Sequence, residues 1–372
     1  MPVGGRRQWR HGYAVGCLWL LSTLGNVAAA AAPSSDTAAP QAVVLVYHHV
    51  ADDTPASTSI TPADFAAHLD YLAQHNHTVW PLPQLVRTLQ QGIAVPPRTV
   101  AITFDDAWSS VYTTAHPLLK ARGWPYTVFV NTAAVEAGRR NVMSWSELQE
   151  LAMDGVTIGN HSHQHAHLVA RGVGQSEQQW RQWVQTDIGT AQRLIQQHTG
   201  VRPELFAYPY GEYTAALGAI IRDQALVGFG QHSGAIGPAS DFSALPRFPM
   251  GGHYTDLTRL ATAVNTRPLY VTAHPSGPWV VEAGQTLAPA LQLHVQPGDF
   301  DAAQLACYAS GYGRLDITQL ATGQFQIASG TPLNVGRTKY NCTAPSRAVS
   351  GVYHWWSYLF MRPPADGMWY RG

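Results

Sequence analysis

The chain has 372 residues, which is enough for one large domain or for a large and a small domain with well-developed cores. Charged residues make up 12% of it, against about 25% in average soluble proteins, and 23 basic residues balance 23 acidic ones. Because there is no net charge and no block of like charge, neither nucleic acid nor an anionic membrane surface is an expected partner.

The first 30 residues have the pattern of an export signal. Three arginines within the first ten residues precede an apolar run over residues 13–24, and small residues follow at 27–30. We therefore expect a signal peptide over 1–30, a flexible Ala/Ser/Pro-rich leader over 31–41, and a periplasmic or extracellular protein. No later apolar run approaches the ~20 residues of a membrane span, so no stable span is expected.

From residue 42 onward, predicted strands alternate with predicted helices. Apolar, β-favouring runs predict strands at 42–46, 78–80, 98–104, 125–131, 156–159, 205–208, near 227 and 269–272, with a further extended segment at 245–248. Periodic apolar residues and capping signals predict helices beginning at 61–62 and spanning 82–91, 109–122, 145–153, 175–199 and 215–223. Such alternation over about 240 residues implies a parallel sheet, open or closed as a barrel, with its chemistry at the carboxyl ends of the strands.

After residue 278 the helical periodicity fades and short alternating runs appear at 291–295, 313–317 and 324–327. They predict a separate small all-β domain, a β-sandwich, over 282–372, and leave 42–281 to the first domain.

Two cysteines and a group of aromatic residues lie in this last region. Cys307 and Cys342 are expected to form a disulfide, because the protein is expected to be exported. Trp355 and Trp356 are adjacent, so in a strand one must point inward and the other outward. The aromatic residues either pack in the core and against the first domain, or form a platform for a glycan.

Two adjacent carboxylates, Asp105 and Asp106, end the most apolar of the strands. Neighbouring side chains of a continuing strand point to opposite faces, so both can serve one site only if the strand stops there and the backbone turns. The alternative is that one of them simply caps the helix that follows.

The strand at 156–159 runs into four histidines within seven residues, His161, His163, His165 and His167. A single histidine is usually a hydrogen-bonded core residue, and a histidine-rich tract can be an exposed metal scavenger. Because this tract and the aspartate pair both follow strand ends, we expect the two to converge. Two histidines and one aspartate with an open position would make a catalytic site of the zinc type.

With the segments AYPYG at 207–211 and the strand-terminal His274, the motifs TFDDAW and HSHQH resemble the ordered motifs of the polysaccharide deacetylases, carbohydrate esterase family 4 with the NodB-homology fold. The resemblance covers about residues 43–276. LVYHHV and ITPADFAAHLDYL further resemble the branch that deacetylates poly-β-1,6-N-acetylglucosamine. The resemblance implies a distorted (β/α) barrel and a metal-dependent hydrolase that removes N-acetyl groups from N-acetylglucosamine residues of an extracellular or cell-wall polysaccharide. We expect a monomer that acts on an acetylated polysaccharide.

The resemblance also implies roles for individual residues. It makes Asp105 the general base, and Asp106, His161 and His165 the ligands of a divalent metal, with zinc the expected ion. His163 and His167 have no such role.

Further roles and departures concern other strand ends. The resemblance makes the Tyr210 backbone N–H part of an oxyanion hole and His274 the general acid. Ala107 stands where the family commonly has glycine, which is tolerable unless its φ is positive. Many members have an arginine at the position of Ala207 to orient the base, and Arg247 is expected to do that work instead.

Two other functions remain open. An O-acetyl esterase acting on xylan or a similar glycan would use the same site, and a non-catalytic glycan-binding protein would keep the scaffold without the chemistry. A two-carboxylate glycosidase is weaker, because it would leave the histidines unexplained.

Overall fold

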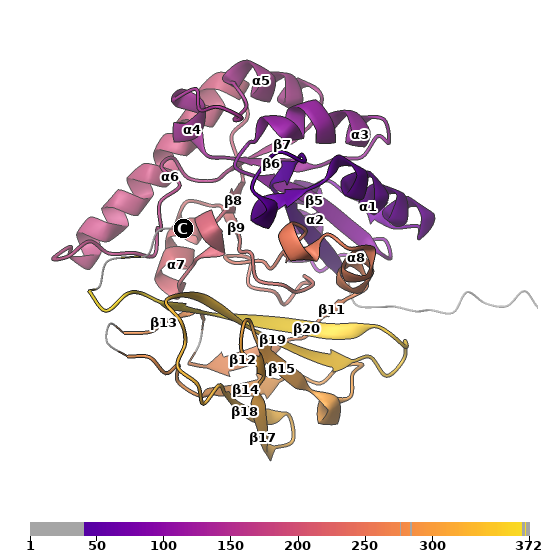
Figure 1. Cartoon of the computed structure of the whole chain (residues 1–372), viewed down its shortest axis with the longest axis vertical. Helices are drawn as coiled ribbons and strands as arrows, with labels where there is room; N and C mark the ends of the chain where they lie inside the picture. Colours follow the sequence, from indigo (N-terminus) through magenta and orange to yellow (C-terminus); the bar gives the residue numbers. More distant parts are fainter. Residues whose placement is uncertain (1–40, 276, 283–284, 367–368, 370–372) are drawn as a thin grey trace, which may run out of the picture. The chain divides into compact units, whose positions relative to one another are not determined.

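The computed structural model describes residues 41–275, 277–282, 285–366 and 369 (Figure 1). The predicted signal peptide over 1–30 and all but the last residue of the predicted leader lie outside the described residues. The described residues belong to one compact unit. Within the described part, none of the helices combines the length and the apolar character that a membrane crossing requires.

A parallel sheet of eight strands forms the first part of the chain. Seven strands follow one another across it, and a short eighth strand pairs with β5. In spatial order these are β10 (Phe248–Pro249), β1 (Ala42–Tyr47), β5 (Thr99–Asp105), β6 (Thr127–Val130), β7 (Thr157–Asn160), β8 (Leu205–Ala207) and β9 (Val227–Phe229), with β4 (Thr78–Val79) beside β5. Every residue of β1 and β5 is buried, which explains why both read as continuous apolar runs.

The two edges of this sheet are joined by one extended segment. Leu245 forms a parallel bridge with Phe229 of β9, and Phe248 pairs with Leu45 of β1. The segment therefore contacts both the last and the first strand, which closes the sheet into the distorted barrel that was predicted.

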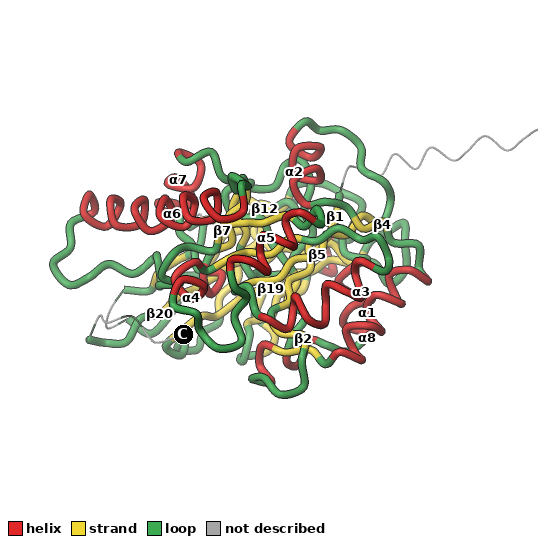
Figure 2. Tube along the Cα trace, turned by 90° about the horizontal axis from the view of Figure 1, so that it is seen from above, coloured by secondary structure: helices red, strands yellow, loops and turns green. Residues whose placement is uncertain are grey.

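Helices lie around the strands, as Figure 2 shows in red. They are α1 (Pro62–Gln74), α2 (Leu82–Gln90), α3 (His116–Lys120), α4 (Thr132–Glu136), α5 (Trp145–Met153), α6 (Glu177–Thr199), α7 (Ala215–Asp223) and α8 (Leu257–Val264). A π-helical turn, η2 (Val111–Ala115), leads into α3, and β2 (His49–Val50), β3 (Ser59–Ile60) and the 3₁₀ turns η1 (Ala56–Thr58) and η4 (Gly252–Tyr254) complete this part.

Capping residues define where several helices begin. The side chains of Thr61, Ser144 and Ser176 each accept a hydrogen bond from the third residue of their helix. The predicted bounds of α5 and α7 agree with the structure. Helix α5 begins just after Ser144, and the Thr214 side chain caps α7 in the same way.

Two further sheets follow in the last third of the chain. One has the order β11 (Arg267–Pro268), β20 (Tyr353–Arg362), β19 (Gly336–Pro345), β15 (Ala306–Ala309) and β16 (Gly313–Arg314), with β13 (Trp279–Val280) also pairing with β20. The other has the order β12 (Val271–His274), β14 (Leu291–Val295), β18 (Gln324–Ala328) and β17 (Asp316–Ala321), and a 3₁₀ turn, η5 (Ala302–Gln304), precedes β15. Buried side chains from both sheets form one shared core.

The expected boundary at residue 282 is wrong, because the β architecture already begins at Arg267. The strand expected at 269–272 in the barrel is β12, which pairs antiparallel with β14 through Val271 and Val295. An alternating apolar run predicts a strand but not its partner, and here the partner comes later in the chain.

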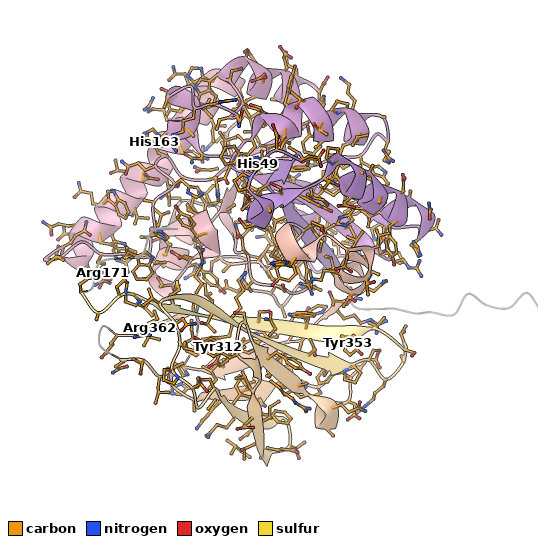
Figure 3. All side chains as sticks on the ribbon, in the orientation of Figure 1. His49, His163, Arg171, Tyr312, Tyr353 and Arg362 are labelled. Carbon is orange, nitrogen blue, oxygen red and sulfur yellow. A yellow bond between two sulfur atoms is a disulfide. The ribbon has the colours of Figure 1, made fainter. Side chains whose placement is uncertain are left out.

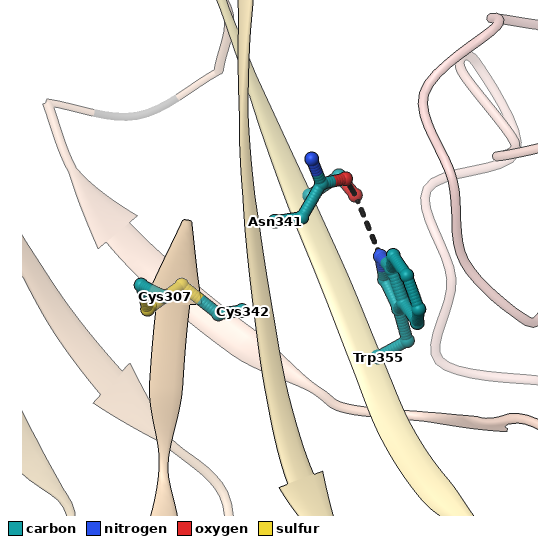
Figure 4. The surroundings of a disulfide bond; sticks show 5 residues. Cys307, Asn341, Cys342 and Trp355 are labelled. Carbon is teal, nitrogen blue, oxygen red and sulfur yellow. Dashed lines mark hydrogen bonds between the residues drawn. A yellow bond between two sulfur atoms is a disulfide. The ribbon is translucent and has the colours of Figure 1, made fainter. Parts of the chain in front are cut away.

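The predicted disulfide between Cys307 and Cys342 is confirmed, and it joins directly opposite residues of β15 and β19 (Figure 4). Trp355 and Trp356 point to opposite faces of β20. Trp355 packs edge-on against Phe248 of the barrel, with ring centres 5.4 Å apart, whereas Trp356 packs on the core between the two C-terminal sheets.

Other residues of β20 also reach the barrel. Leu359 and Met361 are buried in one cluster with Phe206 and Tyr208, which flank the end of β8. The inner face of β20 therefore packs against the barrel.

Candidate active site

The carboxyl end of β5 carries the two aspartates into one site. The strand ends at Asp105, and the next two residues, Asp106 and Ala107, have φ values of 73° and 56°. This left-handed turn breaks the alternation of a strand, so both carboxylates can serve the same place. Alanine at position 107 was expected to be tolerable unless its φ is positive. The φ of Ala107 is positive, which costs a residue with a Cβ about 1 kcal/mol.

Asp106 and two histidines converge on a common point. The Asp106 Oδ1 atom lies 3.4 Å from His161 Nε2 and 3.1 Å from His165 Nε2. All three candidate ligand atoms lie within 4.8 Å of one another. A tight turn brings the second histidine into place, with Ser162 at φ 66° and its hydroxyl accepting a hydrogen bond from the His165 N–H.

The chemistry of these atoms fits a divalent cation. His161 donates its Nδ1–H to the Ala207 carbonyl at 2.7 Å, which leaves Nε2 as a lone pair directed at the carboxylate. Both His161 Nε2 and Asp106 Oδ1 are buried without a hydrogen-bond partner. Burial lowers the pKa of His161, but Asp105 and Asp106 raise it by more. The space between the two atoms therefore attracts a positive charge, which a proton or a metal cation can supply. Two imidazoles and one carboxylate suit zinc.

The site's electrostatics favour the ionised carboxylate. Burial by itself raises the pKa of Asp106, but its contacts with His161 and His165 outweigh this and hold that pKa well below the usual value. Asp106 therefore offers a negative charge to a cation.

The other two histidines of the tract have different partners. His163 (Figure 3) shares a hydrogen bond between its Nδ1 and the Thr132 hydroxyl at 2.9 Å. His167 contacts the Glu212 carboxylate through Nδ1 at 2.7 Å. The structure thus brings two of the four histidines to Asp106, and the sequence alone could not say which two.

Asp105 is fully buried and held by an arginine. Arg247 donates from Nη1 and Nη2 to the two carboxylate oxygens at 2.7 and 2.8 Å, and Gln231 donates from Nε2 to Oδ2 at 3.2 Å. Burial raises the pKa of Asp105, but the Arg247 charge and its hydrogen bond outweigh burial and lower that pKa. The carboxylate is therefore ionised and fixed in orientation.

Tyr210 lies beside the histidines, in the 3₁₀ turn η3 (Pro209–Gly211) that follows β8. Its φ is 59°, and its ring meets His165 edge-on at 4.6 Å and stacks on His167 at 4.1 Å. The next residue must be glycine: a Cβ on Gly211, at φ 69°, would lie 2.6 Å from the Gln231 side chain.

His274 does not join this group. It is exposed on β12, opposite Gln292 of β14. Among the described residues, no hydrogen bond, ion pair or ring contact links it to Asp105 or to the three candidate ligands. Its strand belongs to a C-terminal sheet, so the expectation that it ends a barrel strand is wrong.

His48 is a site residue to which sequence reasoning gave no role. It follows β1 and interacts electrostatically with Asp105, Asp106, Arg247 and His161. Burial is the largest influence and lowers the pKa of His48, while the two carboxylates raise it. Its position directly after an apolar strand was the signal that could have found it.

A stacked pair lies beside His48. His49 (Figure 3) stacks on Trp108 with ring centres 4.1 Å apart, and burial lowers the pKa of His49 to about 4. The Trp108 Nε1–H donates to Asp106 Oδ2 at 3.2 Å. One oxygen of Asp106 is thereby occupied by an indole, which directs the other oxygen to the histidines.

Residues 92–228 match the sequence profile of the family described as polysaccharide deacetylase. YxkH of Bacillus subtilis is 24% identical over 169 residues, which cover 45% of this chain and 56% of YxkH. The poly-β-1,6-N-acetyl-D-glucosamine N-deacetylase of Staphylococcus aureus (strain MRSA252) is 24% identical over 196 residues, which cover 51% of this chain and 67% of that enzyme. The match to YxkH therefore spans little more than half of that protein.

Among solved structures, the Streptococcus pyogenes deacetylase PplD in complex with acetate aligns with a TM-score of 0.55 at 18% identity. The alignment covers 61% of this chain and 99% of PplD. At that identity the likeness establishes the fold, which agrees with the barrel closed by Leu245 and Phe248.

Proposed function

Because the chain belongs to the polysaccharide deacetylase family, a group of hydrolases, we propose that it is a metal-dependent enzyme that removes N-acetyl groups from N-acetylglucosamine residues of a polysaccharide. The observation that carries this proposal is the buried, Arg247-held carboxylate of Asp105 beside the unpartnered Asp106 Oδ1 and His161 Nε2. The substrate class is supported by the Staphylococcus aureus relative, whose name gives poly-β-1,6-N-acetyl-D-glucosamine.

Asp106, His161 and His165 are the residues that would hold the metal, and zinc is the expected ion. When bound, such an ion lowers the pKa of water and polarises a carbonyl oxygen. Asp105 stays free of the ion in this assignment, because Arg247 and Gln231 already engage its two oxygens.

The protein's own groups account for the proton movements. Asp105 accepts a proton as a water oxygen attacks the acetyl carbonyl carbon, and the Tyr210 backbone N–H donates a hydrogen bond to the resulting oxyanion. The carbon–nitrogen bond then breaks, the leaving nitrogen takes up one proton, and acetic acid forms, which loses its remaining proton to the solvent to give acetate. Asp105 can supply the proton that the nitrogen takes up, because it holds the one that it accepted from the water.

Export is part of the same proposal. A disulfide is typical of oxidising compartments, and residues 1–30 have the pattern of a signal peptide. We place the mature, monomeric enzyme outside the cytoplasm, where an extracellular or cell-wall polysaccharide is accessible.

Acetate release by the purified mature chain tests the proposal. The protein is incubated with β-1,6-linked N-acetylglucosamine oligomers and, separately, with O-acetylated xylan, each with and without a chelator. We expect acetate from the first substrate, loss of activity with the chelator and recovery on adding zinc. Acetate from xylan alone would instead identify an O-acetyl esterase. Binding of the oligomers without any acetate release would identify a glycan-binding protein.

A further inference from the structure

Strand β19 of the C-terminal region carries two cations to the loops that form the active site. Lys339 Nζ donates to the Gln231 carbonyl at 2.6 Å. Arg337 Nη1 lies 3.3 Å from Glu212 Oε1 and 3.4 Å from the Tyr210 carbonyl, and its guanidinium carbon lies 5.3 Å from the centre of the Tyr210 ring. Both side chains therefore contact segments that follow barrel strands β8 and β9.

The segment that Lys339 holds frames the Asp105–Arg247 pair. The Gln231 amide donates to Asp105 Oδ2, the Gly230 carbonyl accepts from Arg247 Nε at 2.8 Å, and the His232 carbonyl accepts from the Arg247 backbone N–H at 2.9 Å. A shift of this three-residue segment would move both the carboxylate and the arginine that orients it.

Burial at this position disfavours the charged form of the Lys339 side chain. Burial and the positive charges of Arg337 and Arg259 lower the pKa of Lys339 to about 8. Within the described residues, no carboxylate lies at ion-pair distance from its ammonium group. Its ammonium group donates to the Gln231 carbonyl, and its backbone N–H donates to the Ser310 hydroxyl at 2.9 Å. A hydrogen bond to the Gln231 carbonyl does not in itself require a charged donor at this buried position.

We propose that Lys339 is a positioning residue of the hydrolytic site, which acts from the C-terminal sheet through Gln231 to set the orientation of Asp105. Arg337 contacts Tyr210, whose ring lies against His165. The C-terminal sheet is then a component of the active site and not only a neighbouring module. This inference rests on the proposed deacetylase function.

The primary variant is Lys339→Met, which removes the ammonium group and keeps the length of the side chain. We expect kcat on N-acetylglucosamine oligomers to fall about tenfold, since small displacements of a catalytic group are costly in rate. KM and the bound-metal content should stay near the wild-type values, because neither Lys339 nor Gln231 contacts the proposed metal ligands. Lys339→Arg should recover part of the loss by donating to the same carbonyl.

A double-mutant cycle distinguishes positioning from general destabilisation. Gln231→Ala keeps the backbone carbonyl but removes the amide that reaches Asp105. If Lys339 acts through that amide, Lys339→Met should cause little further loss of kcat in the Gln231→Ala background. Arg314→Met, which removes an exposed cation from β16 of the same sheet, is the matched control and should leave kcat unchanged.

The outcomes separate the two proposals. Wild-type kcat in Lys339→Met, or multiplicative losses in the double variant, would overturn the positioning role while leaving the deacetylase function intact. A wild-type protein that releases no acetate would overturn the proposed function and this inference with it. If Lys339→Met fails to fold, Lys339→Gln and the Gln231→Ala variant carry the same comparison, and wild-type kcat in both would again overturn the role.

Discussion

The barrel and the C-terminal sheets use the backbone in opposite ways. At the barrel's strand ends the chain turns through positive φ at Asp106, Ala107, His165 and Tyr210, and each turn directs a polar group to one place. The C-terminal sheets instead contain long ladders, such as the ten-residue pairing of β19 with β20. The difference indicates that the irregular turns supply the chemistry and that the regular sheet holds part of them in position.

The largest expected effect comes from removing the C-terminal region. Deleting residues 282–372 should leave no folded barrel, because Leu359 and Met361 fill a cluster with Phe206 and Tyr208, and Trp355 packs on Phe248. Size-exclusion chromatography and circular dichroism of the shortened protein measure this. A soluble, folded barrel would contradict the packing, and loss of activity on polymer but not on oligomers would then favour a glycan platform.

Loss of a metal ligand should remove activity without unfolding the chain. His161→Ala should abolish both tight metal binding and acetate release, since a three-ligand site loses its geometry with any one ligand. Metal content by plasma mass spectrometry is the measurement. His163→Ala is the control, because His163 bonds to Thr132 and not to Asp106, and its effect on metal content should be slight.

The disulfide should contribute to stability and little to chemistry. The variant Cys307→Ser with Cys342→Ser opens a link between residues 35 apart in the sequence, and we expect a loss of about 2–4 kcal/mol in the free energy of unfolding. Urea denaturation measures this loss, and acetate release at low temperature should stay near the wild-type rate. A large loss of kcat in a folded variant would mean that the β15–β19 link also sets the active site.

The smallest effect concerns one backbone angle. Ala107→Gly should raise the free energy of unfolding by about 0.5 kcal/mol, because glycine adopts a positive φ without the clash of a Cβ. Ala101→Gly, in the middle of β5, is the matched control and should lower it by about 1 kcal/mol. An equal decrease in the free energy of unfolding in both variants would show that Ala107 is not strained.

Local signals in the sequence predicted much of the barrel. The cap at Thr61, the apolar runs of β1 and β5 and the paired aspartates all depend on neighbouring residues, which a sequence displays directly. The pairing partner of a strand does not depend on neighbouring residues in this way, and β12 was therefore assigned to the wrong sheet. Likewise the contact between Lys339 and Gln231 joins residues 108 positions apart, and no local pattern marks either of them.

The site, like the barrel, was predictable where it depends on local sequence and not where it depends on packing. Asp105, Asp106 and the histidine tract follow predicted strand ends, so their convergence could be inferred from the parallel topology. Which histidines face Asp106 depends on the turn at Ser162, and the contribution of His48 depends on how β1 aligns with β5. These features are set by packing and register, which sequence periodicity does not determine.

The account separates two neighbouring aspartates, one that binds the metal and one that moves protons, and Asp105→Asn tests this separation most directly. Metal content and acetate release are measured on the same preparation. We expect a full complement of bound metal and a fall in kcat of about 10²-fold or more, since general-base catalysis contributes about 10² to 10⁴. Loss of the metal from Asp105→Asn, or wild-type turnover by it, would contradict the account.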